Sequence, residues 1–246
     1  MDKLIPTIIY KDENYVLLDK PAGMIVNNAD TSRDVCTVQD WVEKNFNLQP
    51  KTYNFENPSE FLKRGGIVHR LDKETSGALI VALNEESFVA LQEQFKERLV
   101  KKEYIALCHG KLVPEGEINV PIGRLPWNRM RFGVIPQGRA SYTKFKTMKH
   151  LVLKNGRDSE ELSLVHVFPQ TGRTHQIRVH FQYAGHPIFA DALYAGRKTI
   201  LRDRKILNRH FLHASKIAFL SPTTNKEVEF IAPLSPELVD FLSKLS

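Results

Sequence analysis

Apolar residues along the chain fall mostly in short runs separated by polar turns, a pattern that predicts many short strands and few helices. Residues 8–20 form two apolar stretches around a polar Asp-Glu-Asn turn, which predicts a pair of strands. Residues 78–83 are wholly apolar and predict a buried strand. Further strands are predicted at five segments, followed by a late hairpin: 103–108, 117–120, 141–148, 151–154 and 161–168, then 214–231.

Four segments show helical spacing. Apolar residues recur at helical intervals after Thr37, with Asp40 at the capping-box offset, and again after Asn84 as far as Leu99. Residues 174–184 fit either a strand or a helix by periodicity, but Thr174 ahead of the apolar positions and Gly185 after them favour a helix. A last helix is predicted from Ser235, with a proline at its first position.

These elements do not alternate regularly as strand and helix, so we predict an α+β fold with a mixed, largely antiparallel sheet and flanking helices. Residues 47–66 are polar and are predicted to form a long loop. Cys108 and Met148 are expected in the core. At about 100–200 residues per domain the length allows one domain or two small ones, and we expect one domain over residues 1–246.

Composition narrows the class of protein without naming its function. The chain has 246 residues, with 35 Lys and Arg against 28 Asp and Glu, so its formal net charge is +7. No apolar run approaches the ~20 residues of a spanning helix, and no signal peptide is evident, so a cytoplasmic protein is expected. Two distant cysteines, Cys36 and Cys108, predict no disulfide framework. The basic excess hints at a polyanionic partner.

Several chemistries lack their sequence signals. The chain has no phosphate-binding GxxxxGK[ST] loop, no dinucleotide-binding GxGxxG and no HExxH zinc motif. The chain has nine histidines, but the clustered ones lack acidic or cysteine partners at ligand spacing: His175, His180 and His186, and the pair His210 and His213. No metal and no cofactor are therefore expected.

The densest polar segment is His-Arg-Leu-Asp-Lys-Glu-Thr-Ser-Gly at residues 69–77, between two apolar strands. A loop this polar between core elements must lie at a cleft or be extensively hydrogen-bonded. From the residues alone, a surface turn in which Asp72 pairs with Arg70 or Lys73 remains open. Residues 169–178 have a similar character, and Arg173 there could bind a carboxylate or phosphate, or form only an ion pair at a helix start.

Together these two segments identify a resemblance. HRLDKETSG, TGRTHQIRVH and GHPI resemble the RluA family of RNA pseudouridine synthases, and the similarity extends almost end to end. IIYKDENYVLLDKPAGMIV is similar to the opening strands of that family, KKEYIALCHG to its Lys-x-Tyr strand, and RHFLHASKIAF to a late strand.

The resemblance implies the pseudouridine synthase catalytic fold, with a central cleft, and the isomerisation of uridine to pseudouridine in ribosomal RNA, tRNA or both. It implies that Asp72 is the essential carboxylate, either as nucleophile or as a base at the sugar. Tyr104 corresponds to the active-site tyrosine that takes the C5 proton or stacks on the uracil, and Arg173 to the basic partner of the aspartate. The three side chains should converge in one cleft. Arg70 matches the position thought to fill the space that the flipped base leaves.

Two basic segments are candidates for RNA contact, with a solvated basic face as the alternative for each. Residues 124–131 interleave arginines with a tryptophan, which suits phosphate contact and base stacking. Residues 197–209 hold six Lys or Arg against one Asp. The predicted contacts are Arg124, Trp127, Arg129, Arg131, Arg197, Lys198, Arg202 and Arg204.

The chain also departs from the family pattern. Its family-like part begins near Thr7, so we expect no N-terminal S4 RNA-binding module, and we expect a monomer. Asn27 and Asn28 stand where the family often has His-Pro, and Ala190 stands where it usually has glycine before Asp191. Two alternatives remain: an RNA-binding or RNA-folding protein on this scaffold with secondary catalysis, and a basic hydrolase that uses Asp72 on another anionic substrate.

Overall fold

The computed structural model describes residues 4–28, 35–48, 59–155 and 158–246. The chain divides into two compact units. The first unit comprises Met1–Lys101 and Ala214–Pro233, and the second comprises Lys102–His213 and Leu234–Ser246. The single catalytic domain expected over 1–246 stays a prediction.

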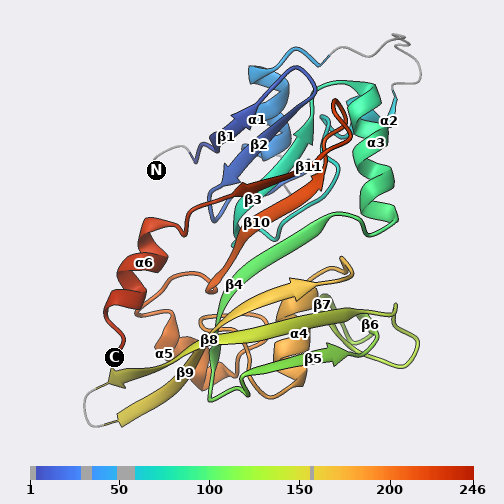
Figure 1. Cartoon of the computed structure of the whole chain (residues 1–246). Helices are drawn as coiled ribbons and strands as arrows, with labels where there is room; N and C mark the ends of the chain where they lie inside the picture. The colour runs from blue at the N-terminus through green and yellow to red at the C-terminus, as the bar shows by residue number, and fades with distance from the viewer. Residues whose placement is uncertain (1–3, 29–34, 49–58, 156–157) are drawn as a thin grey trace. The chain divides into compact units, whose positions relative to one another are not determined.

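The first unit holds a sheet in the order β1-β2-β3-β10, with β11 paired to β10. The pairs β1–β2, β2–β3 and β10–β11 are antiparallel, as the predicted hairpins at both ends of the chain require. Every residue of β3 is buried, which confirms the central strand predicted from its continuous apolar run. The strands are β1 (Thr7–Lys11), β2 (Tyr15–Lys20), β3 (Ser76–Ala82), β10 (Leu212–Leu220) and β11 (Glu227–Ile231) (Figure 1).

The helices of this unit are α1 (Val38–Asn45), α2 (Glu60–Lys63) and α3 (Glu85–Lys96). The capping box at Thr37 is confirmed, and Asn84 caps α3 by accepting the N–H of Ser87 at 2.9 Å. The predicted extension of α3 to Leu99 is wrong, because the helix ends at Lys96 and Leu99 is 53% exposed. Helix α2 interrupts the loop predicted over 47–66, of which residues 49–58 lie outside the described part of the chain.

The second unit has a sheet in the order β4-β9-β8-β5, in which neighbouring strands are antiparallel. The segments predicted at 141–148 and 151–154 are one strand, β8, which carries a bulge between Thr147 and Lys149. The prediction that Met148 lies in the core is wrong: the bulge leaves it unpaired and half exposed, whereas Cys108 is buried as predicted. The strands are β4 (Lys101–His109), β5 (Glu115–Asn119), β8 (Tyr142–Asn155) and β9 (Asp158–Pro169).

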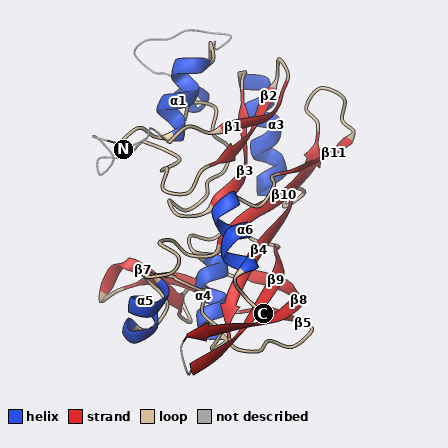
Figure 2. Ribbon diagram, turned by 90° about the vertical axis from the view of Figure 1, so that its left-hand side faces the viewer, coloured by secondary structure: helices blue, strands red, loops and turns tan. Residues whose placement is uncertain are grey.

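A separate two-stranded sheet, β6 (Ile122–Leu125) with β7 (Asn128–Val134), was not predicted from the sequence. Three helices complete this unit: α4 (Gln176–Tyr183), α5 (Arg197–Asp203) and α6 (Pro236–Ser243) (Figure 2). Ile177 and Phe181 of α4 join the apolar cluster on one face of the sheet, and Phe241 of α6 joins a second cluster. The helix favoured over a strand at 174–184 is therefore confirmed.

The α+β class and the largely antiparallel sheet are confirmed, while the central cleft stays a prediction. Within the described residues, no helix is long and apolar enough to cross a membrane.

Candidate active site

The polar segment 69–77 is a short, tightly fixed connection that ends in β3. The Nε2 atom of His69 accepts the N–H of Ile80 at 3.0 Å, and the imidazole stacks on Phe95 with ring centroids 4.7 Å apart. The N–H of Thr75 donates to the carbonyl oxygen of Asp72 at 3.1 Å, which closes a turn. Asp72 is half-buried at the start of this turn, which leads directly into β3.

Gly77 explains why this segment must end in glycine. Its φ is +110°, a conformation that side chains with a Cβ rarely adopt. A Cβ atom here would lie 2.2 Å from the carbonyl oxygen of Ala214 on β10. The close approach of β3 to β10, just after the turn that carries Asp72, therefore depends on glycine.

Lys20 is a buried cation that sequence reasoning missed. Its side chain is fully buried at the end of β2, and its Nζ donates to the carbonyl oxygens of Pro21 at 2.9 Å, Met24 at 2.9 Å and Lys73 at 3.2 Å. The N–H of Gly23 also donates to the carbonyl oxygen of Lys73, at 2.8 Å. Lys20 therefore fastens the Pro-Ala-Gly-Met turn to the residue that follows Asp72. The sequence signal is weak: a lysine at the end of a strand, directly after Asp19.

Tyr104 lies on β4 in the second unit, opposite Val167 of β9. It is half-buried and packs against the apolar cluster that includes Ala106 and Cys108, the residues that share its face of the strand. The Tyr104 ring is therefore held by its packing against this cluster, and it lies on the face of the sheet that α4 covers.

Arg173 lies in the loop between β9 and α4, and this loop is held by hydrogen bonds. The N–H of Arg173 donates to Oε1 of Gln176 at 3.0 Å, and its Nε donates to the carbonyl oxygen of Ala140 at 3.3 Å. The Gln176 amide in turn donates to the carbonyl oxygen of Tyr142 at 3.0 Å and to Oγ1 of Thr143 at 2.9 Å. The loop is thus fixed to the start of β8, while the Arg173 side chain is half-buried.

Lys102 links the strand of Tyr104 to the loop of Arg173. It precedes Tyr104 by two residues and so shares its face of β4, and its Nζ lies 3.8 Å from where a Cβ of Gly172 would stand. Burial lowers the pKa of the Lys102 ammonium to about 8. Tyr104 and the Arg173 loop therefore belong to one end of the second unit. The convergence of Asp72 with them stays a prediction.

The basic segment at 124–131 is the β6–β7 hairpin. Trp127 at its tip is 78% exposed, and Met130 on β7 is 75% exposed. Arg124 lies over the ring of Phe132, 4.9 Å from the centroid, and donates to the carbonyl oxygen of Arg129 at 2.6 Å. The hairpin therefore presents an indole and several cations to solvent.

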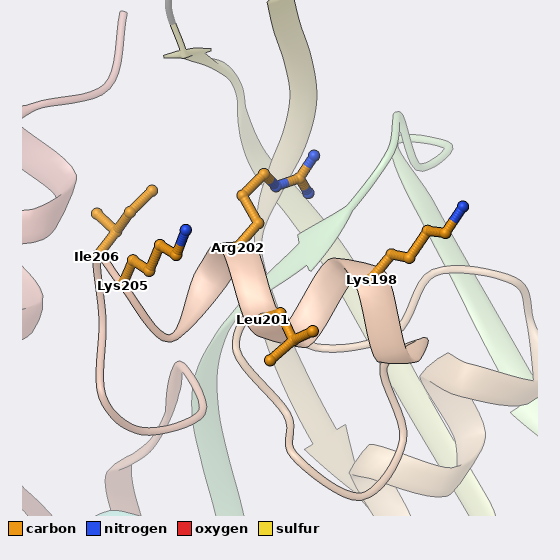
Figure 3. Close-up of a pocket in the computed structure, with 5 residues that line it drawn as sticks. All are labelled: Lys198, Leu201, Arg202, Lys205 and Ile206. Atoms are coloured by element: carbon orange, nitrogen blue, oxygen red, sulfur yellow. The ribbon is translucent and has the colours of Figure 1, made fainter.

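Helix α5 carries the second basic segment. A pocket of about 340 Å³ runs along this helix and the turn after it, lined by Lys198, Leu201, Arg202, Lys205 and Ile206 (Figure 3). The guanidinium of Arg202 is already paired, with Glu160 at 2.5 Å and Asp203 at 3.3 Å. Arg197 and Lys198 are exposed, whereas Arg204 donates to the carbonyl oxygen of Asn208.

A buried charge network attaches α5 to the sheet. The two imidazole nitrogens of His109 lie 2.9 Å from Glu160 and 2.9 Å from Asp203, and Asp203 is fully buried. Burial alone would lower the pKa of His109, but hydrogen bonds and charge from Asp203 and Glu160 raise it to about 9. His109 is therefore a cation at neutral pH. Among the described residues, no group of three or more His, Cys, Asp or Glu is arranged to hold a metal ion.

Comparison with known proteins decides the family. The profile of the family described as RNA pseudouridylate synthase matches residues 14–183, a span that includes Asp72, Tyr104 and Arg173. The chain belongs to this family. An uncharacterized RNA pseudouridine synthase of Mycoplasma genitalium is 31% identical over 97% of this chain and 70% of its own length. Ribosomal large subunit pseudouridine synthase D of Vibrio vulnificus is also 31% identical, again over 97% and 70%.

A solved structure, human RNA Pseudouridylate Synthase Domain Containing 1, is 26% identical and superposes with a TM-score of 0.72 over 97% of this chain and 88% of that one. The resemblance to RluA-type pseudouridine synthases is thereby confirmed, as are the pseudouridine synthase fold and the isomerase class.

The two departures from the family pattern each have a structural counterpart. Asn28 accepts a hydrogen bond from the Oγ1 of Thr37 at 2.5 Å and donates to Asp40 at 2.8 Å, so it extends the cap of α1. Ala190 has a φ of +58°, a left-handed conformation that favours glycine. Its N–H donates to Oδ2 of Asp203 at 3.1 Å, so the buried network around His109 helps to hold this conformation.

Proposed function

We propose that this pseudouridine synthase isomerises specific uridines in ribosomal RNA, tRNA or both, in the cytoplasm, as a monomer without a cofactor. Ribosomal RNA is supported by relatives that are named for the large ribosomal subunit. The observation that carries the assignment of residues is the fixed turn at Asp72, which is fastened by Lys20 from one side and by β3 from the other.

Asp72 acts on the ribose of the target uridine. The N1–C1′ bond breaks with its electron pair leaving on the uracil, the uracil turns, and C5 bonds to C1′. The proton on C5 is then lost and N1 gains one, so the reaction is an isomerisation without redox change. A carboxylate must be ionised for either role, as nucleophile at C1′ or as base at the sugar.

Arg173 offsets the desolvation that a closed site would impose on Asp72, because a neighbouring guanidinium favours the charged carboxylate. Tyr104 takes the C5 proton or stacks on the uracil. A phenol is a weak base at neutral pH, and Lys102 on the same face of β4 supplies nearby positive charge.

The exposed basic residues hold the RNA. Trp127 at the hairpin tip is suited to stacking on an unpaired base, and Arg129 and the free surface of α5 are suited to phosphates. The target uridine has to leave its stack to reach a half-buried carboxylate, and Arg70, which is exposed next to Asp72 in the sequence, is the candidate to fill the vacated space.

The test compares Asp72→Asn with the wild type and with Asp240→Asn, a control in which an exposed carboxylate of α6 is neutralised. Pseudouridine is mapped by carbodiimide treatment and primer extension across ribosomal RNA and tRNA from a deletion strain, and RNA binding is measured by filter retention. We expect Asp72→Asn to bind RNA and form no pseudouridine, while Asp240→Asn matches the wild type. Unchanged product from Asp72→Asn would remove the assignment of Asp72, and a wild type that binds RNA without forming pseudouridine would favour an RNA-binding role.

A further inference from the structure

Tyr194, which the reaction scheme above does not use, lies where the β6–β7 hairpin meets the loop of Arg173. Its side chain is buried, at 4% exposure. Its hydroxyl oxygen accepts the N–H of Phe132 on β7 at 3.0 Å and lies 2.9 Å from Nδ1 of His175. One hydroxyl therefore joins the backbone of the hairpin to a residue two positions after Arg173.

The tyrosine is itself rigidly held. Oδ1 of the buried Asp191 accepts the backbone N–H of Leu193 at 2.9 Å and that of Tyr194 at 3.2 Å. Arg178 pairs with Asp191 through two bonds of 2.7 and 2.9 Å, and its guanidinium lies 5.1 Å from the centre of the Tyr194 ring. Burial alone would raise the pKa of Asp191, but the ion pair with Arg178 lowers it, so the carboxylate that supports Tyr194 stays charged. The hydroxyl of Tyr194 is thus a fixed point.

The two segments that meet at this hydroxyl also contact each other. The ring of Phe132 packs edge-on against His175, with centroids 5.6 Å apart, and the guanidinium of Arg131 lies 5.3 Å from the centre of the Tyr194 ring. Both hairpin residues belong to β7, the strand that begins beside the exposed indole of Trp127. A shift of the hairpin therefore changes the surroundings of His175 directly.

His175 is a position at which such a shift would matter. Its φ is +55°, in the left-handed region, and it stands directly before α4. A residue other than glycine adopts this conformation only at an energetic cost, so contacts around it must hold it there. Arg173 lies on the same short loop, and its own placement depends on where that loop enters the helix.

We propose that Tyr194 is a positioning residue that couples the β6–β7 hairpin to the Arg173 loop, so that RNA bound on the hairpin fixes Arg173 for the reaction. The inference rests on the proposed function, in which the hairpin binds RNA and Arg173 supports Asp72. Tyr194 touches neither RNA nor uridine in this scheme. It acts through His175.

The test uses Tyr194→Phe, which keeps the ring under Arg131 and Arg178 but removes the hydroxyl. Single-turnover pseudouridine formation is measured at saturating large-subunit ribosomal RNA transcript. The hydroxyl makes two hydrogen bonds, with the N–H of Phe132 and with His175, and their loss corresponds to about tenfold or more, so we expect the rate to fall at least about tenfold while RNA affinity changes by less than about threefold. The matched control is Tyr183→Phe, which removes an exposed hydroxyl at the end of α4 and should leave both values unchanged.

A double-mutant cycle separates coupling from ordinary structural damage. Trp127→Ala should weaken binding and, in the wild-type background, also lower the rate at saturation. In the Tyr194→Phe background it should weaken binding alone, because the path to Arg173 is already cut. Equal effects of Trp127→Ala on the saturating rate in both backgrounds, or a wild-type rate for Tyr194→Phe, would overturn the coupling.

A third measurement does not depend on activity. Hydrogen exchange at residues 170–177 should slow when the wild type binds the same transcript, and should not slow in Tyr194→Phe at equal occupancy. If the wild type binds RNA but forms no pseudouridine, the proposed function fails. The exchange measurement still tests whether Tyr194 couples the hairpin to the Arg173 loop. Equal protection of residues 170–177 in both proteins would refute it.

Discussion

His109 is the group whose removal should change the pH dependence of stability most clearly. It bridges Glu160 of β9 and the buried Asp203 of α5, both at 2.9 Å. In His109→Gln, a neutral amide can donate to only one of these carboxylates. We therefore expect the free energy of unfolding to fall at neutral pH, and the loss to disappear at alkaline pH.

The magnitude follows from the pKa of His109, which is 6.5 in an unperturbed state and about 9 in the fold. Because the folded pKa is raised, the stabilisation is fully present below pH 6.5 and is lost as pH rises through 9. Linkage gives about 2–3 kcal/mol at pH 7 and close to zero at pH 10 for a single group with these two pKa values. The difference between wild type and His109→Gln should therefore shrink by about 2–3 kcal/mol between pH 7 and pH 10.

The assay is urea unfolding followed by circular dichroism at pH 7, 8, 9 and 10. His150→Gln is the control, because His150 lies on the surface of β8 and contacts Ser163 rather than a carboxylate. Its difference from the wild type should stay constant over this range. A difference for His109→Gln that is equally large at pH 7 and pH 10 would show that the imidazole is neutral in the fold.

Four further predictions concern five substitutions. Because burial lowers the pKa of Lys102 to about 8, the folded chain loses this proton before the unfolded chain does, so stability should gain a rising contribution between pH 8 and 10 that Lys102→Met abolishes in urea titrations. Lys20→Met leaves three carbonyl oxygens without their donor and should lower the free energy of unfolding by about 3 kcal/mol in the same assay; a loss below about 1 kcal/mol would contradict this role. Gly77→Ala should cost about 3 kcal/mol or more, because its Cβ meets backbone at 2.2 Å, and a wild-type midpoint would refute the clash. In salt titrations of RNA binding, Lys198→Ala should reduce the slope by about 1, whereas the paired Arg202→Ala should reduce it by less; equal reductions would contradict the pairing.

The elements that the sequence predicted correctly are those whose signal is local. The buried run of β3, the capping box at Thr37 and the Asn84 cap each depend on a few adjacent residues. The β6–β7 hairpin was missed because its residues are mostly polar or exposed, so no apolar alternation marks it. The bulge in β8 was missed because register depends on the partner strand, and Met148 was misplaced for the same reason.

The residues of the candidate site show the same contrast between local and long-range signals. Asp72, Tyr104 and Arg173 came from a family resemblance, and the structure adds what holds each of them in its own unit. Lys20 and His109 were missed because their partners lie far along the chain: Lys20 contacts Lys73, 53 residues away, and His109 contacts Asp203, 94 residues away. No spacing rule predicts such pairs, since only the fold brings them together.

The charges counted along the sequence also overstate how many Lys and Arg side chains are available to bind RNA. Residues 197–209 hold six cations against one carboxylate, yet in the fold Arg202 pairs with Glu160 and Arg209 with Glu237, both from outside the segment. Asp203, the one carboxylate within the segment, is buried against His109, so its charge pairs with that imidazole and does not face solvent. A cation that already has a carboxylate partner has to lose that pair before it can neutralise a phosphate, so its net contribution to binding is small. The electrostatic attraction of α5 for RNA therefore comes mainly from its exposed residues, and the paired Arg202 helps to hold the helix where those residues face solvent.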